Sequence, residues 1–299
     1  MILVVGATGL VGGEVCRLLN SEGTPVRALV RADSDPSVVR RLRDAGVELV
    51  RGDLRDSDSL KQACRGMTGI VCTASSMPLD YRAGINDLAT VDLAGLRHLI
   101  DAAIATGTRR FIYTSLSGHI DRPFPLRDAK RTVEGWLIES SLDWTILRPS
   151  YFMETWLSPG AGFDPANGSV TIYGTGKAPI SYISERDVAA FAVAALAGIT
   201  TSRATLELGG PRPIAPLEVV RLFESMLSRT SALSFVPITT LDDHVAAATD
   251  PMQRSLSALM RGYADGDAID MGTTSRMLSR PMTTVESYAA MTMWRVPVG

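Results

Sequence analysis

Residues 1–13 read MILVVGATGLVGG, and this stretch decides the fold. Residues 2–5 are apolar and rich in β-forming side chains, which predicts a strand buried on both faces. Apolar side chains then recur at helical spacing over residues 15–19, and Gly23 closes that helix. The glycines therefore lie in a tight turn between a buried strand and a helix.

The same alternation of strand and helix continues through the first half of the chain. Further strands are expected at residues 25–30, 47–50, 69–74, 110–115 and 144–147, and further helices at 38–46, 57–63 (capped by Ser57), 88–105 and 127–139. Such alternation implies right-handed crossovers and a doubly wound parallel sheet. We therefore predict an α/β fold with a Rossmann-like domain over residues 1–150, to which residues 180–210 return.

Beyond residue 150 the pattern loosens. Residues 158–175 are rich in glycine, proline and asparagine, which is typical of loops. Residues 217–227 and 241–260 have helical patterns. We predict that residues 151–299 form a smaller, mostly helical lobe.

Composition argues against several classes of protein. The formal net charge of -2 offers no broad attraction to nucleic acid or anionic lipid. The sequence has no apolar run of about 18 residues, and its apolar N-terminal stretch lacks the pattern of a signal peptide. Cys16, Cys64 and Cys72 lie in apolar segments without metal-ligand spacing, so we expect buried free thiols. We expect a cytoplasmic monomer or homodimer with no metal, membrane or nucleic-acid partner.

The glycine turn has the spacing of a phosphate-binding loop. In GxxGxxG, the first glycine permits the turn, the second lets the backbone approach a pyrophosphate, and the third allows close helix packing. The helix N-terminus adds free N–H groups and a positive dipole end. A tight turn without ligand is the alternative. The expected dinucleotide contacts here are Gly6, Thr8, Gly9, Leu10, Val11 and Gly12.

The residue after the second strand distinguishes between dinucleotides. NAD-binding versions carry an acidic residue about 20 residues beyond the glycines, which accepts a bond from the ribose 2′-OH. Arg31 stands at this position, and a guanidinium can pair bidentately with a 2′-phosphate. The predicted cofactor is therefore NADP(H). Asp33 is near enough to compete for Arg31, which could instead be a solvated strand-end residue.

Other polar residues follow the strands of the predicted sheet, whose carboxyl edge binds ligands. Asp53 can accept the adenine amino group, or it can be an exposed turn residue. Leu54, Ala74 and Ser75 are expected beside the dinucleotide. Ser115 ends the fifth strand and is a better functional candidate than Ala74 or Ser75, which end the fourth.

Motifs recur along nearly the whole chain, in this order: Gly6-Ala7-Thr8-Gly9, Arg31, Gly52-Asp53-Leu54, Arg110-Phe111-Ile112-Tyr113-Thr114-Ser115, Lys130, Trp144-Thr145-Ile146-Leu147-Arg148-Pro149 and Leu278-Ser279-Arg280-Pro281 with Thr283 and Thr284. Taken in this order, they resemble the NmrA-like family of atypical short-chain dehydrogenases/reductases. The family contains NADPH-dependent quinone, isoflavone and triphenylmethane dye reductases, and also cofactor-sensing regulators without turnover.

The resemblance also bears on acid–base chemistry. Typical short-chain dehydrogenases carry Tyr-x-x-x-Lys, in which the lysine binds the nicotinamide ribose and lowers the pKa of the tyrosine. Leu126 stands four residues before Lys130, so the usual acid is missing. The resemblance implies that Lys130 keeps its ribose role and positions the substrate. An exposed helical lysine is the alternative.

Tyr151 and His119 are other candidate proton donors. Tyr151 follows the sixth strand, and His119 lies in the loop after Ser115. Tyr151 or Phe152 can instead stack near the nicotinamide, and a loop histidine is more often a surface residue. A quinone can take its proton from water, so a reductase does not require a dedicated acid.

We therefore expect an NADPH-dependent oxidoreductase that transfers hydride to a quinone-like or conjugated aromatic small molecule, with residues 151–299 as the substrate-binding lobe. Lys130, Tyr151 and Ser115 are the expected catalytic residues. A non-catalytic NADP(H)-sensing regulator with a protein partner is the alternative. Methionines concentrated near the C-terminus either fill a core or, with Trp156 and Phe163, line an apolar pocket.

Overall fold

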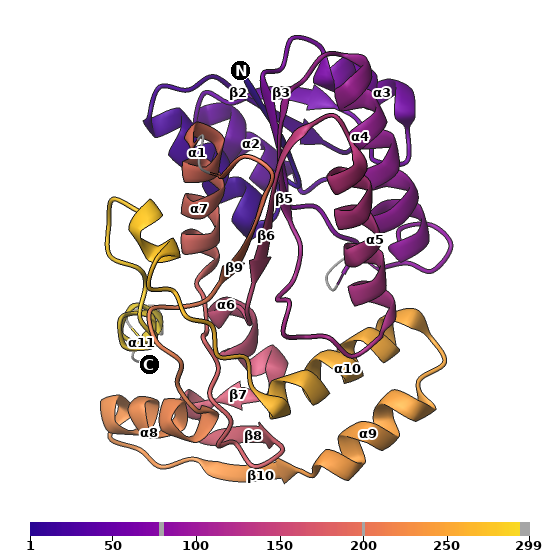
Figure 1. The fold of residues 1–299 in the computed structure, drawn as a ribbon. Helices are drawn as coiled ribbons and strands as arrows, with labels where there is room; N and C mark the ends of the chain where they lie inside the picture. Colours follow the sequence, from indigo (N-terminus) through magenta and orange to yellow (C-terminus); the bar gives the residue numbers. More distant parts are fainter. Residues whose placement is uncertain (78–80, 199–200, 294–299) are drawn as a thin grey trace. The chain divides into compact units, whose positions relative to one another are not determined.

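The computed structural model describes residues 1–77, 81–198 and 201–293 (Figure 1). Its chain divides into two compact units. The first unit comprises Met1–Leu116, Pro125–Arg148 and Val188–Leu206, and the second comprises Ser117–Phe124, Pro149–Asp187 and Glu207–Gly299. Each unit is described separately below.

The first unit is built on a seven-stranded sheet with the order β3-β2-β1-β4-β5-β6-β9. The chain runs outward from β1 to β3 and then returns to β4, and neighbouring strands from β3 to β6 pair in parallel. The predicted Rossmann-like sheet is confirmed. The strands are β1 (Ile2–Val5), β2 (Val26–Val30), β3 (Glu48–Arg51), β4 (Gly69–Cys72), β5 (Arg110–Thr114), β6 (Asp143–Pro149) and β9 (Ala204–Leu208).

Helices cover both faces of this sheet (Figure 1). One face carries α1 (Leu10–Ser21), α2 (Pro36–Asp44) and α7 (Glu185–Ala197). The other face carries α3 (Ser57–Cys64), α4 (Leu96–Ala105) and α5 (Pro125–Glu139). Because strands between two helical layers are buried on both sides, β1 and β4 are apolar along their length, and β5 is buried at every residue although it begins with Arg110 and ends with Thr114.

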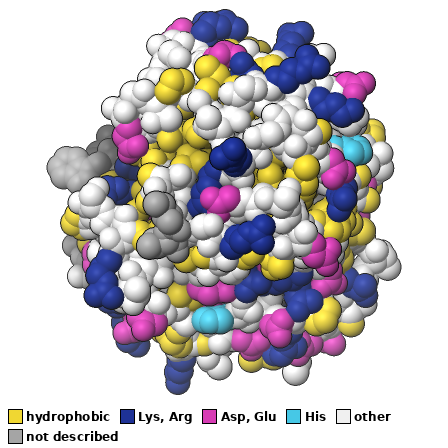
Figure 2. All heavy atoms as spheres, turned by 45° about the horizontal axis from the view of Figure 1, so that its top comes forward, with side chains coloured by type: hydrophobic (Ala, Val, Ile, Leu, Met, Phe, Trp, Pro, Cys, Tyr) yellow, Lys and Arg dark blue, Asp and Glu magenta, His cyan; other side chains and the backbone are white. Residues whose placement is uncertain are grey.

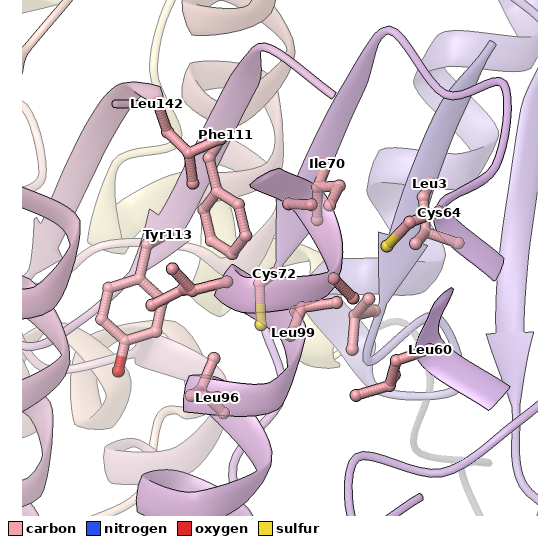
Figure 3. Close-up of a cluster of buried hydrophobic side chains, with 14 of the residues drawn as sticks. Leu3, Leu60, Cys64, Ile70, Cys72, Leu96, Leu99, Phe111, Tyr113 and Leu142 are labelled. Carbon is pink, nitrogen blue, oxygen red and sulfur yellow. The ribbon is translucent and has the colours of Figure 1, made fainter. Parts of the chain in front are cut away.

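A cluster of buried apolar side chains holds α3 and α4 against β1, β4 and β5 (Figure 3). Leu3, Ile70, Leu99 and Phe111 are fully buried in this cluster. Cys16, Cys64 and Cys72 are free and buried, as the sequence analysis expected. Burial raises the pKa of Cys64 to about 12 and that of Cys72 to about 11, so both stay protonated.

Two local predictions in the first unit were wrong. Residues 88–105 do not form one regular α-helix, because a π-helix, η1 (Leu88–Gly95), precedes α4. A Cβ atom on Gly95 would lie 2.8 Å from the Cβ of Leu54, so this segment packs closely on the chain after β3. At α3, Asp56 is the N-cap and accepts bonds from the backbone of Asp58 and Ser59; Ser57 is the first helical residue.

The second unit contains a three-stranded sheet with the order β10-β8-β7, made of β7 (Phe163–Asp164), β8 (Ser169–Tyr173) and β10 (Ala232–Val236). The prediction of loops over residues 158–175 therefore missed β7 and β8. Most of β8's pairing is with β10, which lies far along the sequence, so local composition could not reveal it. The remaining helices are α6 (Met153–Trp156), α8 (Pro216–Leu227), α9 (Ile238–Ala247), α10 (Pro251–Asp265) and α11 (Val285–Met293), with short 3-10 turns η2 (Pro159–Ala161), η3 (Pro165–Asn167) and η5 (Thr274–Met277).

The single helix predicted over residues 241–260 is two helices. Asp250 caps the second one, α10, by accepting bonds from the backbone of Met252 and Gln253. Pro251 occupies its first turn, where a missing N–H costs nothing. Continuous helical spacing hid this break.

Lys and Arg side chains are interspersed with Asp and Glu on the face drawn in Figure 2, in keeping with 30 basic and 32 acidic residues. Among the helices in the described part of the chain, none is both long and apolar enough to cross a bilayer.

Candidate functional site

The glycine turn brings β1, α1 and the end of β4 into very close contact. Gly6 has a positive φ of 90°, and a Cβ on it would lie 2.8 Å from the backbone nitrogen of Ala74. A Cβ on Gly12 would lie only 2.2 Å from the carbonyl oxygen of Gly6. Neither position tolerates a side chain, which is the close approach that the predicted phosphate-binding turn requires.

The N-terminus of α1 is open to an anion. Gly9 precedes the helix, and no described side chain caps it or places an acidic group in its first turn. Gly9 and Leu10 are exposed, while Thr8 and Val11 are half-buried. The first amide groups and the positive end of the dipole therefore face outward from this turn without a built-in counter-charge.

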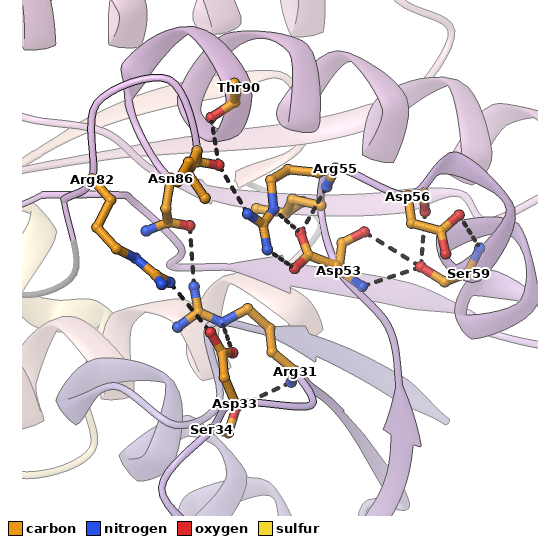
Figure 4. A network of polar contacts seen from close by, with 12 residues as sticks. Arg31, Asp33, Ser34, Asp53, Arg55, Asp56, Ser59, Arg82, Asn86 and Thr90 are labelled. Carbon is orange, nitrogen blue, oxygen red and sulfur yellow. Dashed lines mark hydrogen bonds and ion pairs between the residues drawn. The ribbon is translucent and has the colours of Figure 1, made fainter.

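Arg31 lies directly after β2, within a polar network drawn in Figure 4. Its Nε is 3.2 Å from Oδ1 of Asp33, and its Nη1 donates to Oδ1 of Asn86 at 3.2 Å. The competing partner anticipated from the sequence is thus present. Nη2 of Arg82 lies 3.3 Å from the other carboxylate oxygen of Asp33.

Asp53 belongs to the same network but faces Arg55. Both carboxylate oxygens accept bonds from that guanidinium, at 2.8 and 2.5 Å. These hydrogen bonds are the main reason why the pKa of Asp53 is lowered. An adenine amino group would have to share an oxygen with Arg55, so the adenine role of Asp53 stays a prediction.

The neighbouring predicted contacts lie around the ends of β3 and β4. Leu54 is buried under Gly95, and its carbonyl oxygen lies 3.4 Å from Nδ1 of His98. Ala74 lies against Gly6, as described above, and the Ser75 hydroxyl accepts a bond from the backbone of Met77 at 3.3 Å.

Ser115 follows β5 and binds a buried carboxylate that the sequence analysis missed. Its hydroxyl donates to Oε1 of Glu134 at 2.5 Å, and the same oxygen accepts a bond from Arg131 at 2.6 Å. Nε of Arg148 donates to Oε1 at 3.1 Å. Burial disfavours the charged form of Glu134, but the bonds from Arg148 and Ser115 and the charge of Arg131 outweigh it and lower its pKa. Because the Ser115 proton is committed to Glu134, the hydroxyl is oriented to accept rather than donate.

Lys130 is buried beside β5, so the alternative of an exposed helical lysine was wrong. Its ammonium donates to the carbonyl of Thr114 at 3.3 Å and lies 3.9 Å from Oδ1 of Asp92. Asp92 is also buried, and its other oxygen accepts bonds from the backbone and hydroxyl of Ser76 at 2.9 and 2.6 Å. Oδ1 of Asp92 and Oγ1 of Thr114 are buried without a hydrogen-bond partner among the described residues. Such atoms are normally satisfied by ordered water, an ion or a ligand.

Tyr151 and Phe152 lie in the second unit. The phenol of Tyr151 is buried, its pKa is raised mainly by burial, and it donates to the carbonyl of Leu259 at 3.1 Å. Its ring meets those of Trp156 and Tyr263 edge-on. Phe152 is half-buried and precedes α6. The phenol proton is thus already engaged, and the catalytic role of Tyr151 remains a prediction.

His119, the other candidate donor, forms a dyad within the second unit. Its Nδ1 lies 2.9 Å from Oδ1 of Asp267, which also accepts the Ser117 hydroxyl at 3.0 Å. Asp267 is buried, and burial is the main cause of its raised pKa. The imidazole itself is half-exposed.

Several of these partners carry a weak sequence signal. Asp92 and Glu134 are acidic residues at inward-facing positions of helices, where an apolar side chain is the rule. Asp267 lies far from His119 in sequence, so only the fold reveals the pair. Within the described ranges, no three His, Cys, Asp or Glu side chains are grouped to hold a metal ion.

A doubly wound sheet with a glycine turn and an arginine after β2 defines a dinucleotide-binding protein of the Rossmann class. The NmrA-like family matches residues 1–289, and the chain belongs to this family. The predicted resemblance is thereby confirmed.

Proteins similar to this chain differ in function. The chain is 32% identical to the (4-alkanoyl-5-oxo-2,5-dihydrofuran-3-yl)methyl phosphate reductase of Streptomyces griseus, covering 97% of both chains. It is also 32% identical to the photosystem II assembly factor Ycf39 of Cyanophora paradoxa, over 81% of this chain and 73% of that one. The NADPH complex of the quinone oxidoreductase QOR2 from Escherichia coli shares the fold, with a TM-score of 0.78, 22% identity and coverage of 98% and 100%.

The Gly12→Ala variant tests the glycine turn. The new Cβ would meet the Gly6 carbonyl at 2.2 Å, so α1 must shift. We expect a loss of about 1–3 kcal/mol in unfolding free energy, as for overpacked cores, together with weakened NADP⁺ binding in calorimetry. Gly13→Ala is the matched control, because its Cβ would lie 3.4 Å from the nearest atom. Equal effects of the two substitutions would refute this account.

Glu134→Gln tests the buried carboxylate. Removing one partner of a buried ion pair costs about 3 kcal/mol, and we expect that loss at pH 7 in guanidinium unfolding. Since the folded-state pKa of Glu134 is lowered, its contribution is present above the ordinary glutamate pKa of about 4.3 and is lost as pH falls through the folded value. The difference from wild type should therefore shrink in acid. Glu14→Gln, in the surface pair with Arg17, should cost well under half as much.

Proposed function

We propose that this chain is an NADPH-dependent reductase that transfers hydride to a quinone-like or conjugated aromatic small molecule. The observation that carries the proposal is the glycine turn at the uncapped start of α1, with a guanidinium directly after β2. This pair of features matches a diphosphate and a 2′-phosphate. Membership of a family whose members include reductases supports it.

The residues around β5 fit the other end of the dinucleotide. Lys130 and Asp92 present an ammonium and a carboxylate oxygen without a hydrogen bond, 3.9 Å apart in one buried pair. A ribose offers hydroxyl groups that both donate and accept, so it can satisfy both. We therefore assign this cluster to the nicotinamide ribose, with Lys130 in the role that the sequence analysis predicted.

When bound, the nicotinamide supplies the hydride, and the chain's residues hold and orient it. Ser115 presents an acceptor, because its proton goes to Glu134. Position 126, where typical short-chain dehydrogenases carry their acid, is Leu126. A reduced quinone is stabilised as an anion and can take its proton from water, so a quinone-like acceptor suits a site without a dedicated acid.

The second unit offers an aromatic environment for such a substrate. Trp156 and Tyr263 stack with ring centroids 4.7 Å apart, and Tyr173 meets both rings edge-on. Phe163 packs on Phe223 in the core of this unit. We propose that this unit supplies the apolar contacts to the acceptor.

The reductase proposal is tested by following NADPH oxidation with a panel of quinones, azo dyes and conjugated enones. We expect turnover with quinones and none with simple saturated ketones, whose reduction requires proton donation. If NADPH binds but no acceptor is reduced, the proposal fails. A cofactor-sensing role then takes its place, with the similarity to an assembly factor as its support.

Lys130→Met tests the ribose cluster. Hydrogen bonds to charged groups contribute about 1.5–3 kcal/mol, so we expect NADPH affinity or kcat/KM to fall by about tenfold or more. Methionine keeps the length and fills the buried volume, which limits structural damage. Lys61→Met, on the surface of α3, is the control and should bind NADPH as wild type does. Unchanged NADPH binding and turnover in Lys130→Met would contradict the assignment.

A further inference from the structure

One carboxylate bridges two arginines beside the predicted 2′-phosphate position (Figure 4). Asp33 places Oδ1 3.2 Å from Nε of Arg31 and Oδ2 3.3 Å from Nη2 of Arg82. We propose that Asp33 occupies the place of the cofactor's 2′-phosphate, that Arg82 is the second guanidinium of this subsite, and that NADP(H) displaces the carboxylate. This inference rests on the proposed function, because it concerns the same dinucleotide site.

The chemistry of the two anions supports the exchange. A carboxylate and a phosphate both present oxygens that pair with guanidinium groups. The phosphate carries up to one more negative charge and one more free oxygen, so two arginines favour it over a carboxylate. The hydroxyl of an unphosphorylated ribose carries no charge, so it does not compete with Asp33 for the guanidinium groups of Arg31 and Arg82.

Asp33 can be displaced without disturbing any helix or strand. It lies in the turn between β2 and α2, and its side chain is half-exposed, as is that of Arg82. Exposed ion pairs are screened by solvent and contribute little to stability. The pairing of Asp33 with these two arginines is therefore weak enough for a phosphate to replace it.

Arg82 is held in position by a short turn that also binds Arg31. The backbones of Arg82 and Asn86 exchange two hydrogen bonds of 2.8 Å, and the buried Asn86 side chain accepts from Arg31. Nη1 of Arg55 donates to the carbonyl of Ile85 at 2.8 Å, and Asp53 holds that guanidinium. This turn fixes the backbone of Arg82 and binds the guanidinium of Arg31, so both arginines are anchored to it before a ligand arrives.

The network also gives Asp53 and Arg55 a positioning role. Their ion pair anchors the turn at residues 82–86 rather than contacting the phosphate itself. Both residues follow β3, so residues after β3 support the proposed recognition of the 2′-phosphate by Arg31, which follows β2.

The test compares two ligands that differ only in the 2′-phosphate, adenosine 2′,5′-bisphosphate and adenosine 5′-monophosphate (AMP), by calorimetry on the full chain. Asp33→Asn keeps the shape but removes the charge, and it should tighten the bisphosphate by about threefold, the scale of an exposed ion pair. Arg82→Gln should weaken the bisphosphate by about tenfold or more, as for a lost charge-assisted bond, and reduce the salt dependence of binding. AMP affinity should not change in either variant.

The controls are Asp101→Asn and Arg97→Gln, an exposed ion pair on α4 that gives the same charge changes away from this turn. If Asp33→Asn fails to tighten the bisphosphate, or if Arg82→Gln weakens both ligands equally, the inference is overturned. Asp33→Asn does not depend on the turn at residues 82–86, so it decides the matter even if Arg82→Gln disturbs that turn. If the wild-type chain binds neither ligand, the proposed function fails as well. If the wild-type chain binds the bisphosphate, the results for the variants test this inference alone.

Discussion

The contact between Gly6 and Gly12 is the constraint on which the first unit depends. The backbone of α1 approaches β1 so closely that a Cβ on Gly12 would overlap the Gly6 carbonyl. This approach sets where α1 begins, and no described side chain caps the first amide groups there. Since β1 also pairs with both β2 and β4, the same turn fixes the binding position relative to Arg31 and to the residues after β4. One backbone contact therefore orders the fold and the candidate dinucleotide site together.

Buried charge is the second organising feature. Glu134 and Asp92 lie inside the unit, where an isolated carboxylate would be very costly. The carboxylate of Glu134 accepts hydrogen bonds from Ser115, Arg131 and Arg148. In Asp92, one oxygen accepts bonds from Ser76, and the other lies 3.9 Å from the ammonium of Lys130. The first network is complete and orients Ser115, while the second leaves Oδ1 of Asp92 without a hydrogen bond among the described residues, which is the basis for proposing a ribose there.

A division of roles between cofactor and protein is consistent with the different functions of the relatives. A nicotinamide cofactor carries the hydride chemistry, so a protein that binds it needs few catalytic groups of its own. Proteins similar to this chain include both a reductase and an assembly factor, so the fold alone does not fix the function. In this chain, Leu126 replaces the usual tyrosine, and this replacement is the sequence observation behind the proposal of an acceptor that needs little help with protonation.

Local sequence determined the strand, turn and helix at the N-terminus, the alternation of strands and helices that follows, and the burial of the three thiols. Each of these features depends on residues close together in the chain. The glycine spacing and Arg31 were recognisable for the same reason, whereas Lys130 was singled out through the resemblance to the family. Tertiary structure alone decided what these residues contact: that Arg31 shares Asp33 with Arg82, that Ser115 donates to Glu134, and that Lys130 faces Asp92. It also decided the pairing of β8 with β10 and the π-helical geometry at Asp92. The physical reason is that ion pairs, buried hydrogen bonds and sheet pairing join residues distant in sequence, and periodicity reports only on neighbours.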